Sequence, residues 1–242
     1  MPFTPAHAAA VLPLGRTALP LSALVAGSTV PDVPMFLPGR HGYDVTHSLW
    51  GVVTVDVVLA AAVVWCWFAV VRDPYADVVP GVRDRVPATA GLPRRWAPEA
   101  LAAGLGALTH VVWDSATHPG GWTVERVPWL HTPHAGLLGA QWAQYASGAV
   151  GLAVVGVYVA WWLARRPVVR RAPRVGRPWA WTLAAPAVAV GCGLGGFAAG
   201  SGLEVRAVGA AVAAVQGLVL AMLGVSVAWR AAAGRRAPGE AA

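Results

Sequence analysis

The chain has 242 residues, of which 57% are apolar and 12% are charged. Soluble proteins carry about 25% charged residues, so the composition excludes an ordinary soluble globule and is typical of a protein with several membrane spans. The net charge of +7 comes from 18 arginines without a lysine. Most of these arginines stand between apolar runs, where they indicate membrane anchoring rather than nucleic-acid binding. Cys66 and Cys192 both lie inside apolar runs, which excludes a disulfide framework.

The chain begins with two short apolar segments, residues 7–14 and 19–30. Each is about half a membrane thickness long at 1.5 Å per residue, so we expect a broken or re-entrant helical hairpin buried against other helices. The charged region of a cleaved signal peptide is missing, because the first cationic side chain is Arg16.

Five longer apolar runs follow, each near the 20 residues that a transmembrane helix needs. They cover residues 48–71, 97–117, 136–163, 179–199 and 207–229. The predicted fold is therefore all-α, a polytopic membrane helical bundle of five long spans plus the N-terminal short-helix hairpin.

The expected organisation has four parts. Residues 1–165 form a helical membrane domain with the candidate metal site, and 166–178 an arginine-rich cytoplasmic linker. Residues 179–230 form a two-helix packing hairpin rich in glycine, and 231–242 a disordered tail. Gly191, Gly195, Gly196 and Gly200 give this hairpin two small-xxx-small patterns, which allow helices to approach closely.

The arginines also predict the orientation. The segments 72–96 and 164–178 and the tail, with Arg230, Arg235 and Arg236, alternate correctly to share one side. The positive-inside rule makes that side cytoplasmic. The other side receives residues 31–47, 118–135 and 200–205, and the protein is expected to lie in the cell membrane.

None of the seven histidines lies in an arginine-rich segment, and most fall in or near the outer segments. The strongest local unit is His110, Asp114 and His118, whose spacing of four residues places them along one face of a helix. Imidazole and carboxylate together are ligands for Zn²⁺ and similar ions. The alternative is a polar stripe that is hydrogen-bonded to a neighbouring helix, but ionisable residues inside an apolar helix favour a function.

Three further units are weaker when taken singly. Asp32 stands between two prolines on a rigid turn, and it suits either a ligand or a helix cap. His47 lies in Thr46-His47-Ser48, where the hydroxyl groups suit a helix cap. His7 lies on the first short segment, where a single histidine is more often a core or interfacial residue than a ligand.

In their order along the chain, these four units resemble the YdjM-like membrane-bound metal-dependent hydrolases. The pattern consists of His7, Pro31-Asp32, Thr46-His47-Ser48 and Gly106-x-Leu-x-His110-x-x-x-Asp114. The opening residues 1–7 and the stretch 19–32 resemble, more narrowly, a related bacterial membrane family of unknown function. The resemblance covers residues 1–165.

The resemblance implies a function and a set of ligands. It extends distantly to zinc-dependent phospholipases C and single-strand nucleases, which use clustered metal ions on phosphoesters. It maps His7, Asp32, His47, His110 and Asp114 to the family's proposed metal ligands, with His118 as an addition that related proteins often lack.

Supporting residues follow from position. Gln141 and Gln144, with Ser147 or Gly148, form a polar stripe near the outer end of their helix. We expect these side chains to orient the metal ligands or to hold a substrate. Asp56 lies about 13 Å below His47 along its helix, a depth that requires a partner or a proton. We expect it to pair with Arg16 in the hairpin.

The favoured function is a hydrolase that acts on a phosphoester at the outer face with a divalent metal, which we expect from the ligand set to be zinc. Asp32 or Asp114 would bridge two ions or accept the proton of water. A membrane lipid is the expected partner and the lipid phosphoester the expected substrate. The alternatives are a non-enzymatic scaffold or binding protein with a structural metal site, and a transporter with a His/Asp relay.

Overall fold

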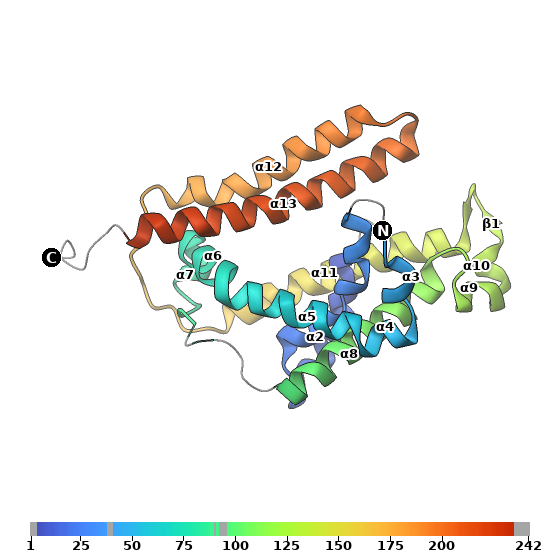
Figure 1. The fold of residues 1–242 in the computed structure, drawn as a ribbon, viewed down its shortest axis with the longest axis horizontal. Coiled ribbons are helices and arrows are strands. Elements are labelled where there is room, and N and C mark those ends of the chain that lie inside the picture. The colour runs from blue at the N-terminus through green and yellow to red at the C-terminus, as the bar shows by residue number, and fades with distance from the viewer. Residues whose placement is uncertain (1–3, 38–40, 90, 92–95, 235–242) are drawn as a thin grey trace. The chain divides into compact units, whose positions relative to one another are not determined.

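The computed structural model describes residues 4–37, 41–89, 91 and 96–234, apart from the side chain of Glu204 (Figure 1). Within these residues the chain is almost entirely helical, and it forms two compact units. The first comprises Met1–Val64 and Pro93–Trp161, and the second Trp65–Leu92 and Trp162–Ala242. The all-α expectation is confirmed except for one short β-hairpin.

The first unit contains many short helices and two long ones. Its helices before the long ones are η1 (Thr4–His7), α1 (Ala8–Val11), η2 (Leu12–Arg16), α2 (Leu21–Gly27), η3 (Val30–Phe36), α3 (Tyr43–Thr46), α4 (Leu49–Val53) and α5 (Val55–Cys66), of which η1, η2 and η3 are 3-10 helices. The rest are α8 (Trp96–Thr117), α9 (Trp122–Arg126), α10 (Pro128–His131), the antiparallel strands β1 (Pro133–His134) and β2 (Leu137–Leu138), and α11 (Gly139–Ala164).

The second unit begins where α5 ends. Its elements are the π-helical segment η5 (Trp67–Val71), then α6 (Arg72–Val78), α7 (Pro80–Arg83), α12 (Pro178–Ala199) and α13 (Leu203–Gly234). The helix α13 thus continues past residue 230, where we expected the tail to begin. Residues 235–242, with Arg235 and Arg236, lie outside the described residues, as do Arg40, Arg94 and Arg95.

Among the residues that the structure describes, four helical stretches are long and apolar enough to cross a membrane: Val55–Val78, Gly139–Ala164, Pro178–Ala199 and Val205–Gly234. They make this a multi-pass membrane protein, but the expected count of five spans is not reached. The missing one is α8, which forms over 22 residues as predicted. It is less apolar than the others because it carries Glu99, His110 and Asp114.

Small residues bring α2 and α8 into close contact in the first unit (Figure 1). A Cβ atom on Gly106 would lie 2.2 Å from the carbonyl oxygen of Leu24, and one on Gly27 would lie 2.1 Å from that of Ala103. Only glycine therefore fits at these two crossings. The close approach places the end of α2 against the polar face of α8.

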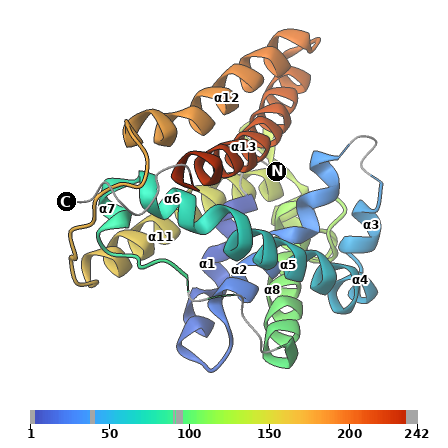
Figure 2. The ribbon, with the colours of Figure 1, turned by 60° about the vertical axis from the view of Figure 1, so that its left-hand side comes forward.

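The helices α12 and α13 lie side by side along their length in the second unit (Figure 2). Gly196 supports this packing, since its Cβ would lie 2.4 Å from the carbonyl oxygen of Gly209. Gly191 and Gly195 have nothing within 4 Å of an added Cβ. The packing role that we expected for the glycine pattern therefore holds for only part of it.

The arginine-rich segment between α11 and α12 is not a simple linker. The backbone N–H of Arg174 donates to both carboxylate oxygens of Asp77, at 3.2 and 3.1 Å, and Trp229 donates to the same carboxylate at 2.8 Å. The backbone N–H of Arg171 donates to Asp84 at 3.2 Å. These bonds join residues 65–92 to the C-terminal part of the chain within the second unit.

Candidate metal centre

The polar face of α8 forms as its spacing predicts. His110, Asp114 and His118 follow one another along one side of the helix, and the first two are buried. The side chain of His110 is fully buried, and its Nδ1 lies 2.8 Å from the carbonyl oxygen of Ser28 at the end of α2. The crossing at Gly106 and Gly27 creates this contact.

That contact fixes the role of one nitrogen of His110. A carbonyl oxygen only accepts, so Nδ1 is a donor. The other nitrogen, Nε2, lies 3.5 Å from Asp32 Oδ1 and 3.4 Å from Asp114 Oδ2. Against the effect of burial, Asp114 and Asp32 raise the pKa of His110 to about 10, so in the metal-free protein Nε2 also carries a proton. Two buried carboxylates call for a positive charge at this point, and a metal ion would take the place of the Nε2 proton.

Asp32 reaches the same place from η3, where Pro31 and Pro34 shape the 3-10 helix. The N-cap of η3 is Thr29 and not Asp32, so the structure does not use Asp32 as the helix cap that the sequence also allowed. Thr4 of η1 donates to Asp32 Oδ2 at 2.5 Å, while Oδ1 is buried and has no hydrogen-bond partner within the part of the chain that the structure describes. Asp32 is thus held by one oxygen and offers the other.

His47 follows α3, which is fastened to η3 by a buried hydroxyl. Thr46 donates toward the carbonyl oxygens of Pro31 at 2.8 Å and Tyr43 at 2.9 Å. Nδ1 of His47 lies 3.0 Å from the same carbonyl oxygen of Tyr43, so Nε2 is the nitrogen that faces the carboxylates. Ser48 caps α4 by accepting from Gly51 at 3.0 Å, as the sequence allows, and His47 faces the centre.

Ligand atoms from Asp32, His47, His110 and Asp114 all lie within 4.8 Å of one another. The Nε2 of His47 is 3.9 Å from Asp32 Oδ1 and 3.6 Å from Asp114 Oδ2. These separations exceed the 2.7–3.2 Å of an N–H···O hydrogen bond. They are close to the spacing of about 3.4 Å between two ligands of a tetrahedral ion with bonds of 2.0–2.2 Å. The cluster has the ligands and the size to hold a metal ion.

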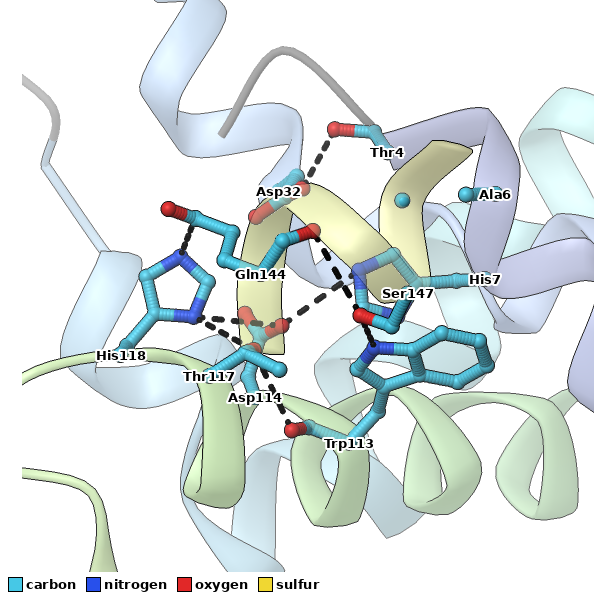
Figure 3. A pocket seen from close by; sticks show the side chains of 11 residues that line it. Thr4, Ala6, His7, Asp32, Trp113, Asp114, Thr117, His118, Gln144 and Ser147 are labelled. Atoms are coloured by element: carbon cyan, nitrogen blue, oxygen red, sulfur yellow. Dashed lines mark hydrogen bonds and ion pairs between the residues drawn. The ribbon is translucent and has the colours of Figure 1, made fainter. Parts of the chain in front are cut away.

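His7 and His118 flank the Asp114 carboxylate (Figure 3). His7 Nε2 and His118 Nδ1 are each 3.4 Å from Asp114 Oδ1. The ring of His7 stacks on that of His110, with centroids 4.0 Å apart. Burial, together with His110, lowers the pKa of His7 to about 4, so its imidazole is neutral at pH 7.

A narrow pocket opens beside Asp114, His7 and His118, with room for about one water molecule or ion. Its other polar walls come from Gln144 and Ser147 of α11 (Figure 3). Gln144 Nε2 lies 2.8 Å from His118 Nε2, and Trp113 donates to Ser147 at 3.1 Å. The expected neighbour Gln144 therefore contacts a candidate ligand directly.

Two other expected supporting residues have different surroundings. Gln141 does not line the pocket, because its Oε1 accepts from the backbone N–H of Leu138 at 2.9 Å, at the start of α11. Asp56 is fully buried, and neither carboxylate oxygen has a hydrogen-bond partner among the described residues. The predicted pairing with Arg16 is wrong, since Arg16 is exposed at the end of η2.

Three histidines of the outer segments lie outside the centre. His131 Nδ1 is 2.9 Å from the carbonyl oxygen of Val124, His134 stacks on Trp129, and His41 lies exposed in a turn. These three histidines therefore contact neighbouring loop residues or solvent and do not contribute to the cluster.

Sequence reasoning missed Thr4, Trp113 and Thr117, all of which line the pocket. Thr117 had a usable signal, since it precedes His118 on the polar face of α8. Thr4 had none, because its contact with Asp32 spans 28 residues.

The chain belongs to the family described as domain of unknown function DUF4184, whose model matches residues 1–227. The match extends beyond residue 165, where our resemblance ends, and includes the hairpin of α12 and α13. The family description names no activity, so a hydrolase function rests on the centre itself. No curated protein and no solved structure matches the chain.

Proposed function

We propose that this membrane protein binds a divalent metal ion through Asp32, His47, His110 and Asp114 and hydrolyses a phosphoester. The observation that carries the proposal is the convergence of two imidazole Nε2 atoms on two carboxylates at 3.4–3.9 Å, without hydrogen bonds between them. Two nitrogen and two oxygen ligands suit Zn²⁺.

A divalent ion in such a site lowers the pKa of a bound water toward about 7 and stabilises developing negative charge. The chain's own residues supply the rest. The carbonyls of Ser28 and Tyr43 orient the two imidazoles, and Thr4 orients Asp32. Gln144 and Ser147 present polar groups to a phosphate oxygen entering the pocket.

Hydrolysis joins the water oxygen to phosphorus, breaks the bond between phosphorus and the leaving oxygen, and moves a water proton to the leaving alcohol. We assign the acceptance of that proton to Asp32 or Asp114, whose carboxylates lie at the pocket. Thr4 holds Asp32, and His110 and His118 lie beside Asp114, so both carboxylates are already positioned at the pocket.

The position of the pocket supports a lipid substrate. Gln144 and Ser147 lie in the first three turns of α11, one of the helices able to span a membrane. This end is opposite to Arg165 and Arg166, so the positive-inside rule places it at the outer face. A phosphoester in a lipid head group would lie at this depth.

The test uses the full chain purified in detergent with zinc, its metal content, and hydrolysis of a chromogenic phosphodiester and of fluorescent phospholipids. We expect bound zinc and hydrolysis in the natural protein and loss of both in His110→Ala and Asp114→Asn. His41→Ala, an exposed histidine outside the centre, is the matched control and should retain both. Metal-free natural protein with unchanged stability in chelator would overturn the proposal.

A structural metal site is the second candidate function, and one observation favours it. The protein itself provides four ligands, most of them buried, and closed four-ligand sites are typical of structural zinc. Such a protein would lose thermal stability on chelation and would show no hydrolysis of any tested phosphoester while zinc is bound.

A further inference from the structure

The helices α12 and α13 of the second unit form an apolar groove between them. Its volume is about 410 Å³, within the range of about 300–1,000 Å³ that is typical of small-molecule sites. Both helices are able to span a membrane, so an apolar chain is the ligand that the groove suits. The groove is lined by Ala180, Trp181 and Ala184 of α12 and by Gly224, Val225 and Ala228 of α13.

This groove lies next to the arginine-rich segment. Its lining residues come from the start of α12 and the end of α13, which lie together because the two helices run antiparallel (Figure 1). Trp181 connects the groove to the segment before α12, since its indole N–H donates to the carbonyl oxygen of Gly176 at 3.1 Å. Arg177 follows directly and is exposed. A positive charge therefore stands beside one end of the groove.

The arginines at this end keep their charge uncompensated. The carboxylate of Asp77 accepts from the backbone N–H of Arg174 and from the indole of Trp229, and not from a guanidinium group. Within the described part of the chain, neither Arg174 nor Arg177 forms an ion pair with an acidic side chain. The guanidinium of Arg174 lies 5.2 Å from the ring centre of Trp229, the residue after Ala228 of the groove.

We infer that the second unit binds an anionic phospholipid, with an acyl chain in the groove and the phosphate at Arg174 and Arg177. Guanidinium groups are suited to phosphate oxygens. The positive-inside rule assigns this end to the cytoplasmic side, where anionic lipids attract basic segments next to membrane spans. All of these residues belong to the second unit, so the lipid is a bound component separate from the metal centre and its proposed substrate.

Native mass spectrometry of the full chain in detergent tests the groove. The protein is titrated with phosphatidylglycerol and with phosphatidylcholine of the same acyl chains, and we expect one phosphatidylglycerol to bind in preference. Gly224→Leu should abolish this binding, because its side chain enters the groove and its Cβ has no atom within 4 Å. Gly191→Leu is the matched control, since Gly191 is equally open but does not line the groove.

A second set of variants tests the charge without altering the groove. Arg177→Asn suits the left-handed backbone at this position, where φ is 50°. It should weaken phosphatidylglycerol binding about fivefold, since one basic residue near a membrane surface contributes about a factor of that size, and leave phosphatidylcholine binding unchanged. Arg177→Lys keeps the charge and should bind as the natural protein does. Arg206→Gln, at the other end of the hairpin, should also bind normally.

Three outcomes would overturn the inference. The first is equal affinity of the natural protein for the two lipids, and the second is phosphatidylglycerol binding that survives both Gly224→Leu and Arg177→Asn. The third is a dimer that Gly224→Leu dissociates, which would assign the groove to a second copy of the chain. The zinc content and the hydrolysis that test the proposed function are measured independently of all three.

Discussion

His110 and Ser28 are joined by a hydrogen bond of 2.8 Å between the imidazole Nδ1 and a backbone carbonyl oxygen. Ser28 follows the last residue of α2, where helix carbonyls lack partners within the helix. One contact thus satisfies a helix end and orients a buried ligand.

Gly106→Ala should displace α2 from α8 and impair the centre. The new Cβ would lie 2.2 Å from the carbonyl oxygen of Leu24, and such overpacking reduces the free energy of unfolding by about 1–3 kcal/mol. The Tm and the zinc content of the protein in detergent should both decrease. Gly104→Ala is the matched control, since its Cβ meets only ordinary contacts at 3.7 and 3.8 Å. It should be neutral or stabilising by about 0.5–1 kcal/mol.

His7 should make the metal-free protein less stable in acid. Its pKa is about 4 when folded and 6.5 as a free side chain, so below pH 6.5 the unfolded state takes up the proton first. Stability is therefore lost as the pH falls from 6.5 to 4, by about 3 kcal/mol at most. Unfolding in chelator between pH 7 and 4.5 should show a smaller decrease for His7→Gln than for the natural protein. Equal slopes would contradict the prediction.

Asp77→Ala should loosen the arginine-rich segment of the second unit. It removes the acceptor for the backbone N–H of Arg174 and for the indole N–H of Trp229. A buried donor left without a partner costs about 1–3 kcal/mol. Limited digestion with trypsin should then cut faster after the arginines of residues 165–177. Thr182→Val, which removes a different hydrogen bond of the same unit, should change the rate less.

Asp56→Asn should stabilise the protein without changing its zinc content. Both oxygens of this fully buried carboxylate lack hydrogen-bond partners in the described ranges of the chain, and a neutral amide is less costly to bury than a charged group. We expect an increase of about 1–3 kcal/mol in the free energy of unfolding, measured as a higher Tm in detergent. A lower Tm together with lost zinc would instead assign Asp56 to the centre.

The sequence is most informative where function follows local periodicity. The spacing of His110, Asp114 and His118 fixes one face of α8, and the structure uses that face. The convergence of Asp32 and His47 on it follows from no local rule. It depends on the glycine crossing of α2 with α8 and on Thr46, and the order of the motifs suggested it only through a family resemblance.

The incorrect expectations share a cause. Arg16 and Asp56 were paired by estimated depth, and Gln141 was placed by its helix face, but depth and face do not determine partners. Gln141 instead binds a backbone N–H three residues away. Likewise, the bonds of Asp77 and Asp84 to the arginine-rich segment span 97 and 87 residues, respectively, so no window of sequence reveals them.

The wide separation of the ligands along the chain has a consequence for biosynthesis. A ribosome delivers Asp32 and His47 well before His110 and Asp114, and Gln144 later still. Until then, Asp32 and His47 lack the partners that surround them in the folded unit. Assembly of the His/Asp cluster is therefore a late event in synthesis, because it waits for α8.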